Sequence, residues 1–420
     1  MKKVLAVMLA AIMLFALAAC GGNGGTGDDK GMSESPIAEV ALNIDYEVPA
    51  DFKIGFICLH DENSTYDKNF LNAVDTIKEA LKLTDEQVIV RVNVPEGNEC
   101  YVAAKDLVTE GCKIVFANSF GHEDFMIQAA KEFPEVEFCH ATGTKAHTEG
   151  VDNYHNAFAS IYEGRYLAGV AAGMKLNEMI AAGQFTAEEA KMGYVGAFTY
   201  AEVISGYTSF YLGAKSVCPS VTMDVQFTGS WYDEQAEKEA AVTLMEKDCV
   251  LISQHADSMG APTACETAGV PNVSYNGSTI AACPNTFIVS SRINWAPYYE
   301  YIIKAVAKGE EIVADWCGGI KEGSVVLTEV NEAAAAEGTQ KAIDDAKAKF
   351  LDGTLKVFAT DTFTKDGAAM ASYMADVDTD SAYTPDTEVI KDGYFSESEF
   401  RSAPYFDVRI DGITLLNEKF

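Results

Sequence analysis

The sequence IGFICLHDENSTYDKNFLNAVDTIKEALKLTDEQVIVRVNV, residues 54–94, decides the fold of this chain. It starts with an apolar, strand-forming run over 54–59, continues with an amphipathic helical pattern over 70–83, and ends with a second apolar run over 88–94. A strand, a helix and a strand in that order predict a βαβ unit, in which the two strands lie parallel in one sheet.

The same alternation continues along most of the chain. Further strands are expected at 113–118, 136–141, 193–197, 221–227, 249–254, 272–275 and 287–293, and helices at 101–109, 125–133, 157–176, 203–216, 234–245, 298–306 and 331–350. The roughly 370 residues after position 50 suit two domains of ordinary size. We therefore predict an α/β protein with two lobes of parallel sheet flanked by helices. The first lobe takes residues 51–165 and about 290–318, and the second takes 166–289 and about 319–358.

The N-terminus has the layout of a bacterial lipoprotein signal. Two lysines precede an apolar run over 4–14, and the stretch LAAC (Leu17–Cys20) matches the lipobox, in which the cysteine receives lipid. Residues 21–50 begin as a Gly-rich polar stretch, which predicts a flexible tether. We expect an extracytoplasmic protein anchored to the cell membrane through acyl chains on Cys20. The alternative is a plain secretory signal whose cleavage site holds a cysteine.

The composition argues against nucleic acid, metal and nucleotide cofactors. With 31 basic and 63 acidic residues, the net charge of −32 repels phosphates. The ten cysteines include no C-x-x-C pair, so we expect free thiols. Cys139, His140 and His147 lack a fourth metal ligand, and the first strand runs into Leu59–Asn63 without the glycines that cradle phosphate. We therefore predict no metal and no cofactor.

The sequence carries no hydrolase motif of the G-x-S-x-G or H-E-x-x-H type. His255 and Asp257 could form a catalytic dyad, but no nucleophile stands at a matching position. We predict that the protein is not an enzyme. A hydrolase that uses His255, Asp257 and Glu202 remains an alternative.

Polar and aromatic residues follow the predicted strands, where open parallel sheets place their ligand crevice. The candidates are Tyr66, Phe70, Ser119 and Phe120 in the first lobe, and Phe198, Glu202, Trp231, Gln254, His255, Asp257 and Asn276 in the second. Aromatic rings from both lobes could enclose a planar ligand, while amide, hydroxyl and carboxylate groups set its orientation. Other roles stay open: Phe70 could belong to the core, Trp231 could fill the seam between the lobes, and Glu202 could favour a helix N-terminus.

Several stretches, taken in their order along the chain, are similar to one known family. They are PEG at 95–97, SFG at 119–121, HATG at 140–143, YEGRYLAG at 162–169, GAF at 196–198, GSWYD at 229–233, QHADS at 254–258 and NWAPYY at 294–299. Over about residues 52–358 the chain resembles the basic membrane protein family of ABC transporter substrate-binding lipoproteins, whose characterised members bind purine bases or nucleosides. The resemblance implies a two-lobe periplasmic-binding-protein type I fold with the ligand in the interlobe cleft. It also implies a protein that works with permease and ATPase subunits, and we expect this protein to be a monomer.

The resemblance also implies roles for single residues. Trp231 takes the stacking position of the second lobe, and either Tyr66 or Phe70 takes that of the first. Asn294, in the last matching stretch, joins the candidate ligand-binding residues.

The chain departs from the nucleoside-binding pattern of that family at two places. Leu71 stands where an amide follows the phenylalanine, and Asn276 stands where an aspartate holds the ribose hydroxyls, with Arg292 in place of the following lysine. A free purine base therefore becomes a plausible ligand.

Two further readings stay open for the cleft: a membrane-tethered receptor that reports a signal molecule, and a binding protein for a sugar or an amino acid. Residues 359–420 form an acidic, turn-rich C-terminal extension, for which the sequence gives no function. We expect a hairpin there, with strands at 406–410 and 413–416 around Asp411 and Gly412.

Overall fold

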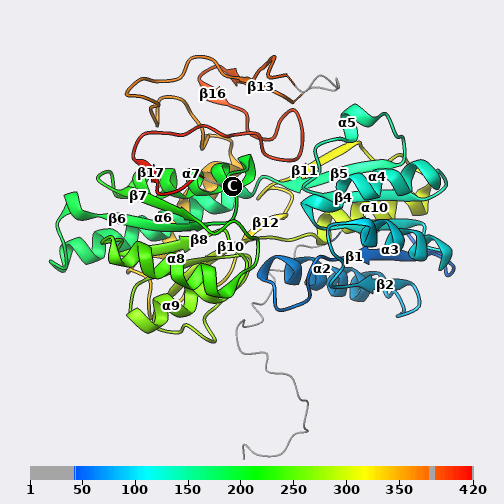
Figure 1. Ribbon diagram of the computed structural model, residues 1–420, viewed down its shortest axis with the longest axis horizontal. Helices are drawn as coiled ribbons and strands as arrows, with labels where there is room; N and C mark the ends of the chain where they lie inside the picture. Colours follow the sequence, from blue (N-terminus) through cyan, green and yellow to red (C-terminus); the bar gives the residue numbers. More distant parts are fainter. Residues whose placement is uncertain (1–41, 43, 378–383, 419–420) are drawn as a thin grey trace, which may run out of the picture. The chain divides into compact units, whose positions relative to one another are not determined.

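A computed structural model of the chain describes residues 42, 44–377 and 384–418. These residues form two large sheets with flanking helices, and a C-terminal segment of short strands (Figure 1). The α/β class and the two parallel sheets predicted from the sequence are confirmed. The signal peptide, Cys20 and most of the tether lie outside the described residues. Within the described part, none of the helices has the length and apolar character needed to cross a bilayer.

The first sheet is parallel throughout, in the order β11-β5-β4-β3-β1-β2. Its strands are β1 (Ile54–Ile57), β2 (Val88–Arg91), β3 (Ile114–Ala117), β4 (Glu137–Ala141), β5 (Tyr154–Ala159) and β11 (Asp315–Gly318). Its helices are α2 (Thr65–Leu81), α3 (Asn98–Thr109), α4 (Glu123–Glu132), α5 (Ala146–Glu149) and α10 (Ala296–Lys308), with a 3-10 turn at Phe120–His122.

Helices bury both faces of this sheet. Ile54 and Phe56 join one apolar cluster with Phe70 of α2, whereas Ile57 joins another with Leu107 of α3. Successive side chains of a strand point to opposite faces, so this split places α2 and α3 on opposite sides of β1. A sheet covered in this way exposes its strand ends, and loops at those ends can form a site.

The second sheet has the order β12-β10-β9-β8-β6-β7-β17 and is parallel except for β12, which is antiparallel to β10. Its strands are β6 (Lys191–Gly196), β7 (Thr222–Phe227), β8 (Leu251–Gln254), β9 (Asn272–Tyr275), β10 (Phe287–Ile293), β12 (Val325–Leu327) and β17 (Ile413–Leu415). Its helices are α6 (Ile161–Ala181), α7 (Ala201–Val217), α8 (Glu234–Glu246), α9 (Gly260–Ala268) and α11 (Thr339–Leu351), with a 3-10 turn at Ala187–Glu189.

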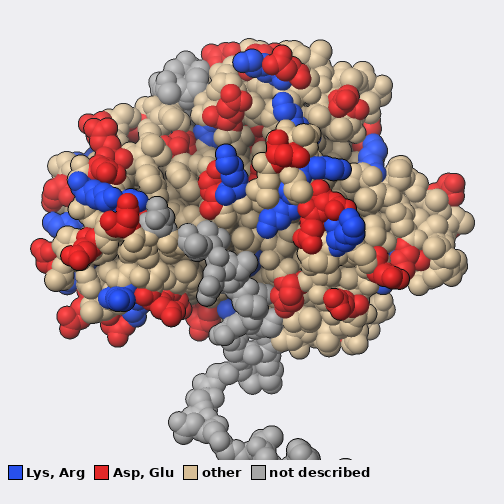
Figure 2. Space-filling model, turned by 180° about the vertical axis from the view of Figure 1, so that it is seen from behind, with Lys and Arg blue, Asp and Glu red and all other residues tan. Residues whose placement is uncertain are grey.

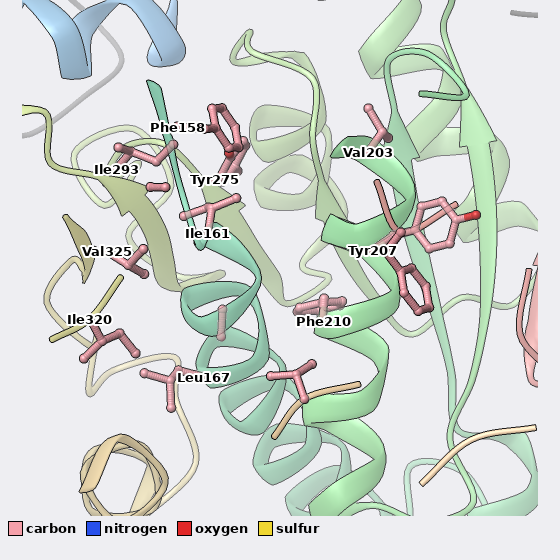
Figure 3. Packing of buried hydrophobic residues seen from close by; sticks show 14 of the residues in the cluster. Phe158, Ile161, Leu167, Val203, Tyr207, Phe210, Tyr275, Ile293, Ile320 and Val325 are labelled. Atoms are coloured by element: carbon pink, nitrogen blue, oxygen red, sulfur yellow. The ribbon is translucent and has the colours of Figure 1, made fainter. Parts of the chain in front are cut away.

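Helices α6 and α7 pack unusually close to one another. A Cβ atom on Gly169 of α6 would lie 2.0 Å from the carbonyl oxygen of Phe210, and one on Gly213 of α7 would lie 2.0 Å from that of Tyr166. Only glycine fits at these two contacts. Figure 3 shows Phe210 pointing from α7 toward α6 in the core of the second lobe.

The chain crosses between the two sheets after β5, after β10 and after β11. Since β10 ends at Ile293, residues 290–293 pair in the second sheet, although the sequence placed them in the first lobe. Helix α6 starts at Ile161 and packs on α7, so the second lobe begins slightly before the expected position 166.

Two expected helices were wrong at their N-terminal ends. Residues 157–159, expected to start a helix, belong to the buried strand β5 (Tyr154–Ala159). This strand was not predicted, because His155 and Asn156 interrupt its apolar pattern. Asn156 is nevertheless buried, and its Oδ1 accepts a hydrogen bond from the backbone N–H of Ala146 at 2.7 Å. Helix α11 starts at Thr339, eight residues later than predicted from position 331.

The C-terminal extension contains the two-residue strands β13 (Met374–Ala375), β14 (Thr387–Glu388), β15 (Ile390–Lys391) and β16 (Tyr394–Phe395), which pair antiparallel as β13 with β14 and β15 with β16. The expected hairpin around Asp411 was wrong. Residues 406–410 form no strand, and β17 instead pairs parallel with β7 at the edge of the second sheet. Gly412 does form a turn, with φ +92°, but the strand that follows it pairs with β7 rather than with residues 406–410.

The nine cysteines of the described part are free thiols. The face shown in Figure 2 carries acidic and basic side chains interspersed with one another. That face offers no broad basic surface for nucleic acid.

Candidate ligand-binding site

A cavity lies between the two sheets, at the carboxyl ends of their strands. Its lining residues are Leu59, His60, Tyr66, Asp67, Ser119, Phe120 and Thr142 from the first lobe, and Glu202, Trp231, His255, Asp257 and Tyr275 from the second. They surround about 420 Å³ of empty space, part of it open to solvent.

The first-lobe wall is fixed by the N-terminus of α2. Ser64 caps this helix by accepting a hydrogen bond from the backbone N–H of Asp67 at 3.2 Å. The hydroxyl of Tyr66 donates to the carbonyl oxygen of Asn118, at the end of β3, at 2.7 Å. These bonds hold the Tyr66 ring against the cavity.

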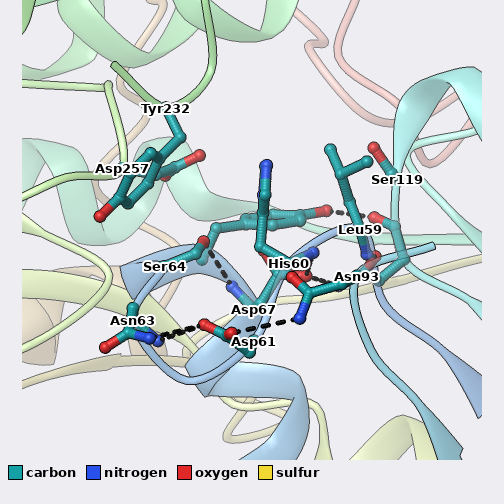
Figure 4. A network of polar contacts seen from close by, with 12 residues as sticks. Leu59, His60, Asp61, Asn63, Ser64, Asp67, Asn93, Ser119, Tyr232 and Asp257 are labelled. Atoms are coloured by element: carbon teal, nitrogen blue, oxygen red, sulfur yellow. Dashed lines mark hydrogen bonds and ion pairs between the residues drawn. The ribbon is translucent and has the colours of Figure 1, made fainter. Parts of the chain in front are cut away.

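Asp67 is the buried carboxylate of this wall (Figure 4). Its Oδ1 accepts hydrogen bonds from the backbone N–H of His60 at 3.1 Å and from Asn118 Nδ2 at 2.7 Å. Burial opposes ionisation, but the hydrogen bonds from His60, Asn118 and Ser64 outweigh it and lower the pKa of Asp67. The first lobe therefore presents an ionised carboxylate.

The second-lobe wall is organised by the buried side chain of Arg165, from α6. Its guanidinium donates to the carbonyl oxygen of Gln254 at 2.9 Å and to His255 Nδ1 at 3.0 Å, and it lies over the Tyr275 ring at 3.2 Å from the centroid. Guanidinium nitrogens only donate, so Nδ1 accepts and the proton of His255 sits on Nε2. Nε2 lies 3.4 Å from Glu202 Oε1.

Burial lowers the pKa of His255, which is consistent with a neutral ring. The ring nitrogens face Arg165, Tyr194 and Glu202, and these contacts orient the ring without supplying a nucleophile.

Asp257 is buried in the same wall but has fewer donors. Its Oδ1 accepts from Asn276 Nδ2 at 3.2 Å. Burial, together with the nearby carboxylates of Glu237, Asp67 and Glu202, raises the pKa of Asp257 well above its usual value. A carboxyl group in this state can donate a hydrogen bond as well as accept one.

The lobes also touch directly beside the cavity. The backbone N–H and the hydroxyl of Thr65 both donate to the carbonyl oxygen of Asp257, at 3.1 and 3.0 Å. Asn69 Nδ2 donates to Asn276 Oδ1 at 3.1 Å. These bonds join the start of α2 to the second-lobe loops and mark a closed arrangement of the two lobes.

Aromatic side chains form the outer part of the cavity. Trp231 packs edge-on against Phe198, with ring centroids 4.9 Å apart, and lies 6.0 Å from Tyr200. Across the cleft, Phe120 faces Tyr200 at 5.5 Å. Each lobe therefore contributes aromatic surface near the opening.

Seven of the candidate residues from the sequence line this cavity. They are Tyr66, Ser119, Phe120, Glu202, Trp231, His255 and Asp257. The structure does not bring Phe70, Phe198, Gln254, Asn276 or Asn294 into the lining.

Those five residues either pack behind the lining residues or lie away from the cavity. Phe70 is buried and stacks on Trp295 at 4.5 Å, and Phe198 supports Trp231. The Gln254 amide oxygen accepts from Asn272 at 3.0 Å inside the sheet.

The two asparagines of this group are also engaged internally. Asn276 bonds Asn69 and Asp257, whereas Asn294 Nδ2 donates to the carbonyl oxygen of Gly323 at 3.2 Å, where the chain crosses between the lobes.

Five lining residues were missed by the sequence analysis. They are Leu59, His60, Asp67, Thr142 and Tyr275. His60 and Thr142 directly follow the strands expected at 54–59 and 136–141, so the strand-end argument could have included them. Tyr275 is the last residue of β9, so the same argument could have included it, whereas Asp67 lies in the first turn of α2 and has no such signal.

The histidines considered as metal ligands in the sequence have other partners. His140 Nε2 lies 2.7 Å from the carbonyl oxygen of Ser119, and His147 pairs with Asp315 at 2.9 Å. Among the described residues, no three His, Cys, Asp or Glu side chains cluster as metal ligands would.

Comparison with known proteins identifies the family. Residues 57–357 match the family described as ABC transporter substrate-binding protein, PnrA-like. The chain belongs to this family. It is 32% identical over 276 residues to a purine-binding protein of Brucella abortus, covering 66% of this chain and 74% of that one.

A second relative, from Haloferax volcanii, is named for glucose binding. It is 30% identical over 251 residues, which are 60% of each chain. Two relatives of this chain are therefore named for different ligands.

Solved structures show the fold. A solute-binding protein from Aeropyrum pernix matches with a TM-score of 0.61 at 16% identity, over 76% of this chain and 94% of that one. One from Conexibacter woesei matches with a TM-score of 0.59 at 19% identity, over 73% and 98%. The predicted periplasmic-binding-protein type I fold is confirmed.

The family gives the general function. As an ABC transporter substrate-binding protein, the chain binds a small molecule outside the cytoplasm and works with permease and ATPase subunits. The predicted transport role is confirmed.

Proposed function

We propose that this protein captures a purine, as a base or a nucleoside, between its two lobes. The observation that carries the proposal is the cavity bounded by Tyr66 from the first lobe and Trp231 from the second. Stacking of a base on an aromatic side chain contributes about 1–3 kcal/mol in nucleic-acid-binding proteins. The purine-binding relative from Brucella abortus supports this ligand class.

The polar groups of the cavity suit the edge of a purine. Asp67 and Glu202 offer carboxylate oxygens to ring N–H and amino groups, and Asp257 and the Nε2–H of His255 can donate to ring nitrogens. A site that mixes acceptors and donors in this way can orient a purine within its plane.

Asn276 does not serve the ligand in this arrangement. It is not part of the cavity lining, its amide oxygen accepts from Asn69, and its amide nitrogen donates to Asp257. A sugar on the purine must therefore find its partners elsewhere, or the ligand is the free base.

Glucose is the second candidate, because the Haloferax volcanii relative carries that name. A thermal-shift screen of purine bases, nucleosides, glucose and amino acids decides between the classes, since a ligand that binds only the folded state raises Tm. A shift with purines alone supports the proposal. A shift with glucose and none with purines contradicts it.

Loss of uptake on deletion of the gene, with signalling unchanged, would favour transport over a receptor role. We further propose that the protein has no catalytic activity. Purines recovered after incubation should be unaltered, and release of free base from a nucleoside would contradict this.

We also propose that a lipid on Cys20 anchors the protein to the membrane and that it acts as a monomer. Cys20→Ser should move it from the membrane fraction to the soluble fraction. Light scattering of that variant should give the mass of one chain.

A further inference from the structure

The C-terminal extension reaches the ligand site, although it lies outside the matched residues 57–357. A second hollow, with about 880 Å³ of empty space including open solvent, adjoins the cavity. The two spaces share Phe120, Thr142, Glu202 and Trp231. The remaining lining of this outer chamber is Thr144, Thr199, Tyr200 and Ala201 from the lobes, and Arg401, Ala403, Pro404, Asp407 and Arg409 from the extension.

The extension is firmly attached to the second lobe. β17 continues the second sheet beyond β7, and Asn417 exchanges two side-chain hydrogen bonds with the backbone of Phe227, at 2.8 and 2.9 Å. Earlier in the extension, the buried Glu397 accepts a hydrogen bond from the hydroxyl of Ser205 on α7 at 2.5 Å.

The same segment also meets the first lobe. The backbone N–H of Ser402 donates to Asp315 Oδ1, in β11, at 2.7 Å. Arg401 stiffens the segment by donating to the carbonyl oxygens of Asp376, Ala403 and Pro404. Residues 401–409, which we call the wall segment, therefore bridge the two lobes beside the outer chamber.

Thr142 stands where the two spaces meet, and it has two unusual properties. Its φ is +69°, a conformation that β-branched residues rarely adopt. Its hydroxyl is buried and, among the described residues, has no hydrogen-bond partner. Strained backbone and unpaired polar atoms gather at binding sites, where a ligand completes them.

We propose that the outer chamber is a subsite for a polar, hydroxylated substituent on the ligand, such as the ribose of a nucleoside, with the wall segment as its third side. The inference rests on the proposed purine function. Threonine hydroxyls, Asp407 and Arg409 offer hydrogen bonds of both kinds to such a substituent, and the Thr142 hydroxyl lies at the junction with the ring. The outer chamber would thus bind the sugar, which Asn276 cannot do because its amide is already hydrogen-bonded within the protein.

Calorimetric titration of the full chain carrying Cys20→Ser with adenine, adenosine, guanine and guanosine tests this. Replacing residues 401–409 by a Gly-Ser sequence of equal length, with β17 kept, should weaken nucleosides at least tenfold and bases less than about threefold. Thr142→Val keeps the shape but removes the hydroxyl, and it should weaken nucleosides about 3- to 10-fold. Ser372→Ala, which removes an exposed hydrogen bond within the extension, is the matched control.

Two results would overturn the subsite: wild-type protein that prefers bases over nucleosides, or variants that weaken both to the same extent. If wild type binds none of the four, the proposed purine function fails instead. Whether the wall segment covers the outer chamber is then tested without ligand, by acrylamide quenching of the Trp231 fluorescence. The protein carries Trp316→Phe for this measurement, and Trp295 is buried, so the quenching reports on Trp231. Quenching should rise when the segment is replaced, and unchanged quenching would show that it does not cover the chamber.

Discussion

The two lobes contribute aspartates to one cavity, and their surroundings move the two pKa values in opposite directions. Asp67 in the first lobe receives hydrogen bonds from His60 and Asn118, which lower its pKa despite burial. Asp257 in the second lobe is buried with carboxylates as neighbours, which raises its pKa. Residue type alone does not set the chemistry of a cleft wall, because burial, nearby hydrogen-bond donors and neighbouring carboxylates together decide which form of the carboxyl group is present.

The walls also differ in what holds them. Backbone groups and a helix cap fix the first wall, whereas the second depends on one charged side chain, Arg165, that reaches the ends of its strands. The second wall should therefore be the more sensitive to substitution.

The largest expected effect is that of Arg165→Met on folding. It leaves the carbonyl oxygen of Gln254 and the Nδ1 of His255 without their donor, so the free energy of unfolding should fall by about 2–4 kcal/mol. Chemical denaturation measures this loss. The exposed Arg409→Met serves as control and should change it by about 0.5 kcal/mol or less. A loss below about 1 kcal/mol for Arg165→Met would show that the second wall does not depend on this residue.

Trp231→Ala should come next and should act on binding. Loss of one stacking partner should cost about 1–3 kcal/mol of purine affinity by calorimetry, with folding largely intact. Trp316→Phe, away from the cavity lining, should leave affinity unchanged. Unchanged affinity in Trp231→Ala would remove Trp231 from the site.

Asp67→Asn should destabilise the protein by about 1–2 kcal/mol at pH 7, because a charged acceptor of two hydrogen bonds is lost. The folded pKa is lowered, so the stabilisation is present above the unfolded value of about 3.9 and is lost as pH falls through the folded pKa. The difference in the free energy of unfolding between the two proteins, measured from pH 7 to pH 3, should therefore shrink as the pH falls below about 3.9. A difference that stays constant with pH would rule out the ionised form.

Asp257→Asn should change the free energy of unfolding in the opposite direction to Asp67→Asn, and by a smaller amount. The folded pKa is raised, so the wild-type carboxyl is favourable below about pH 3.9 and becomes unfavourable as pH rises toward the folded pKa. The variant should gain about 1 kcal/mol at pH 8 and nothing near pH 3. Denaturation at the two pH values measures this, and a loss of stability at pH 8 would contradict the contrast between the lobes.

Much of the fold could be predicted because alternating apolar strands and amphipathic helices are local patterns. Two failures came from long-range effects. The buried polar pair His155 and Asn156 hid β5, since their partners lie in other elements. β17 pairs with β7, about 190 residues away, although the local turn at Gly412 suggested a hairpin.

The site could be predicted in its position but not fully in its residues. Strand ends located the cleft, yet side chains at neighbouring positions point in opposite directions: Gln254 bonds within the sheet, and the next residue, His255, lines the cavity. Asn276 was expected at the ligand and is instead bonded to Asn69 and Asp257. The contribution of the extension had no signal in the sequence, because it depends on where β17 docks.

The most direct test of a purine site between the lobes is a crystal structure of the protein grown with the purine that gives the largest thermal shift. We predict that the purine ring lies between Tyr66 and Trp231, with its edge facing Asp67, Glu202 and Asp257. A purine bound outside this cavity, or a ring that contacts neither aromatic side chain, would contradict it.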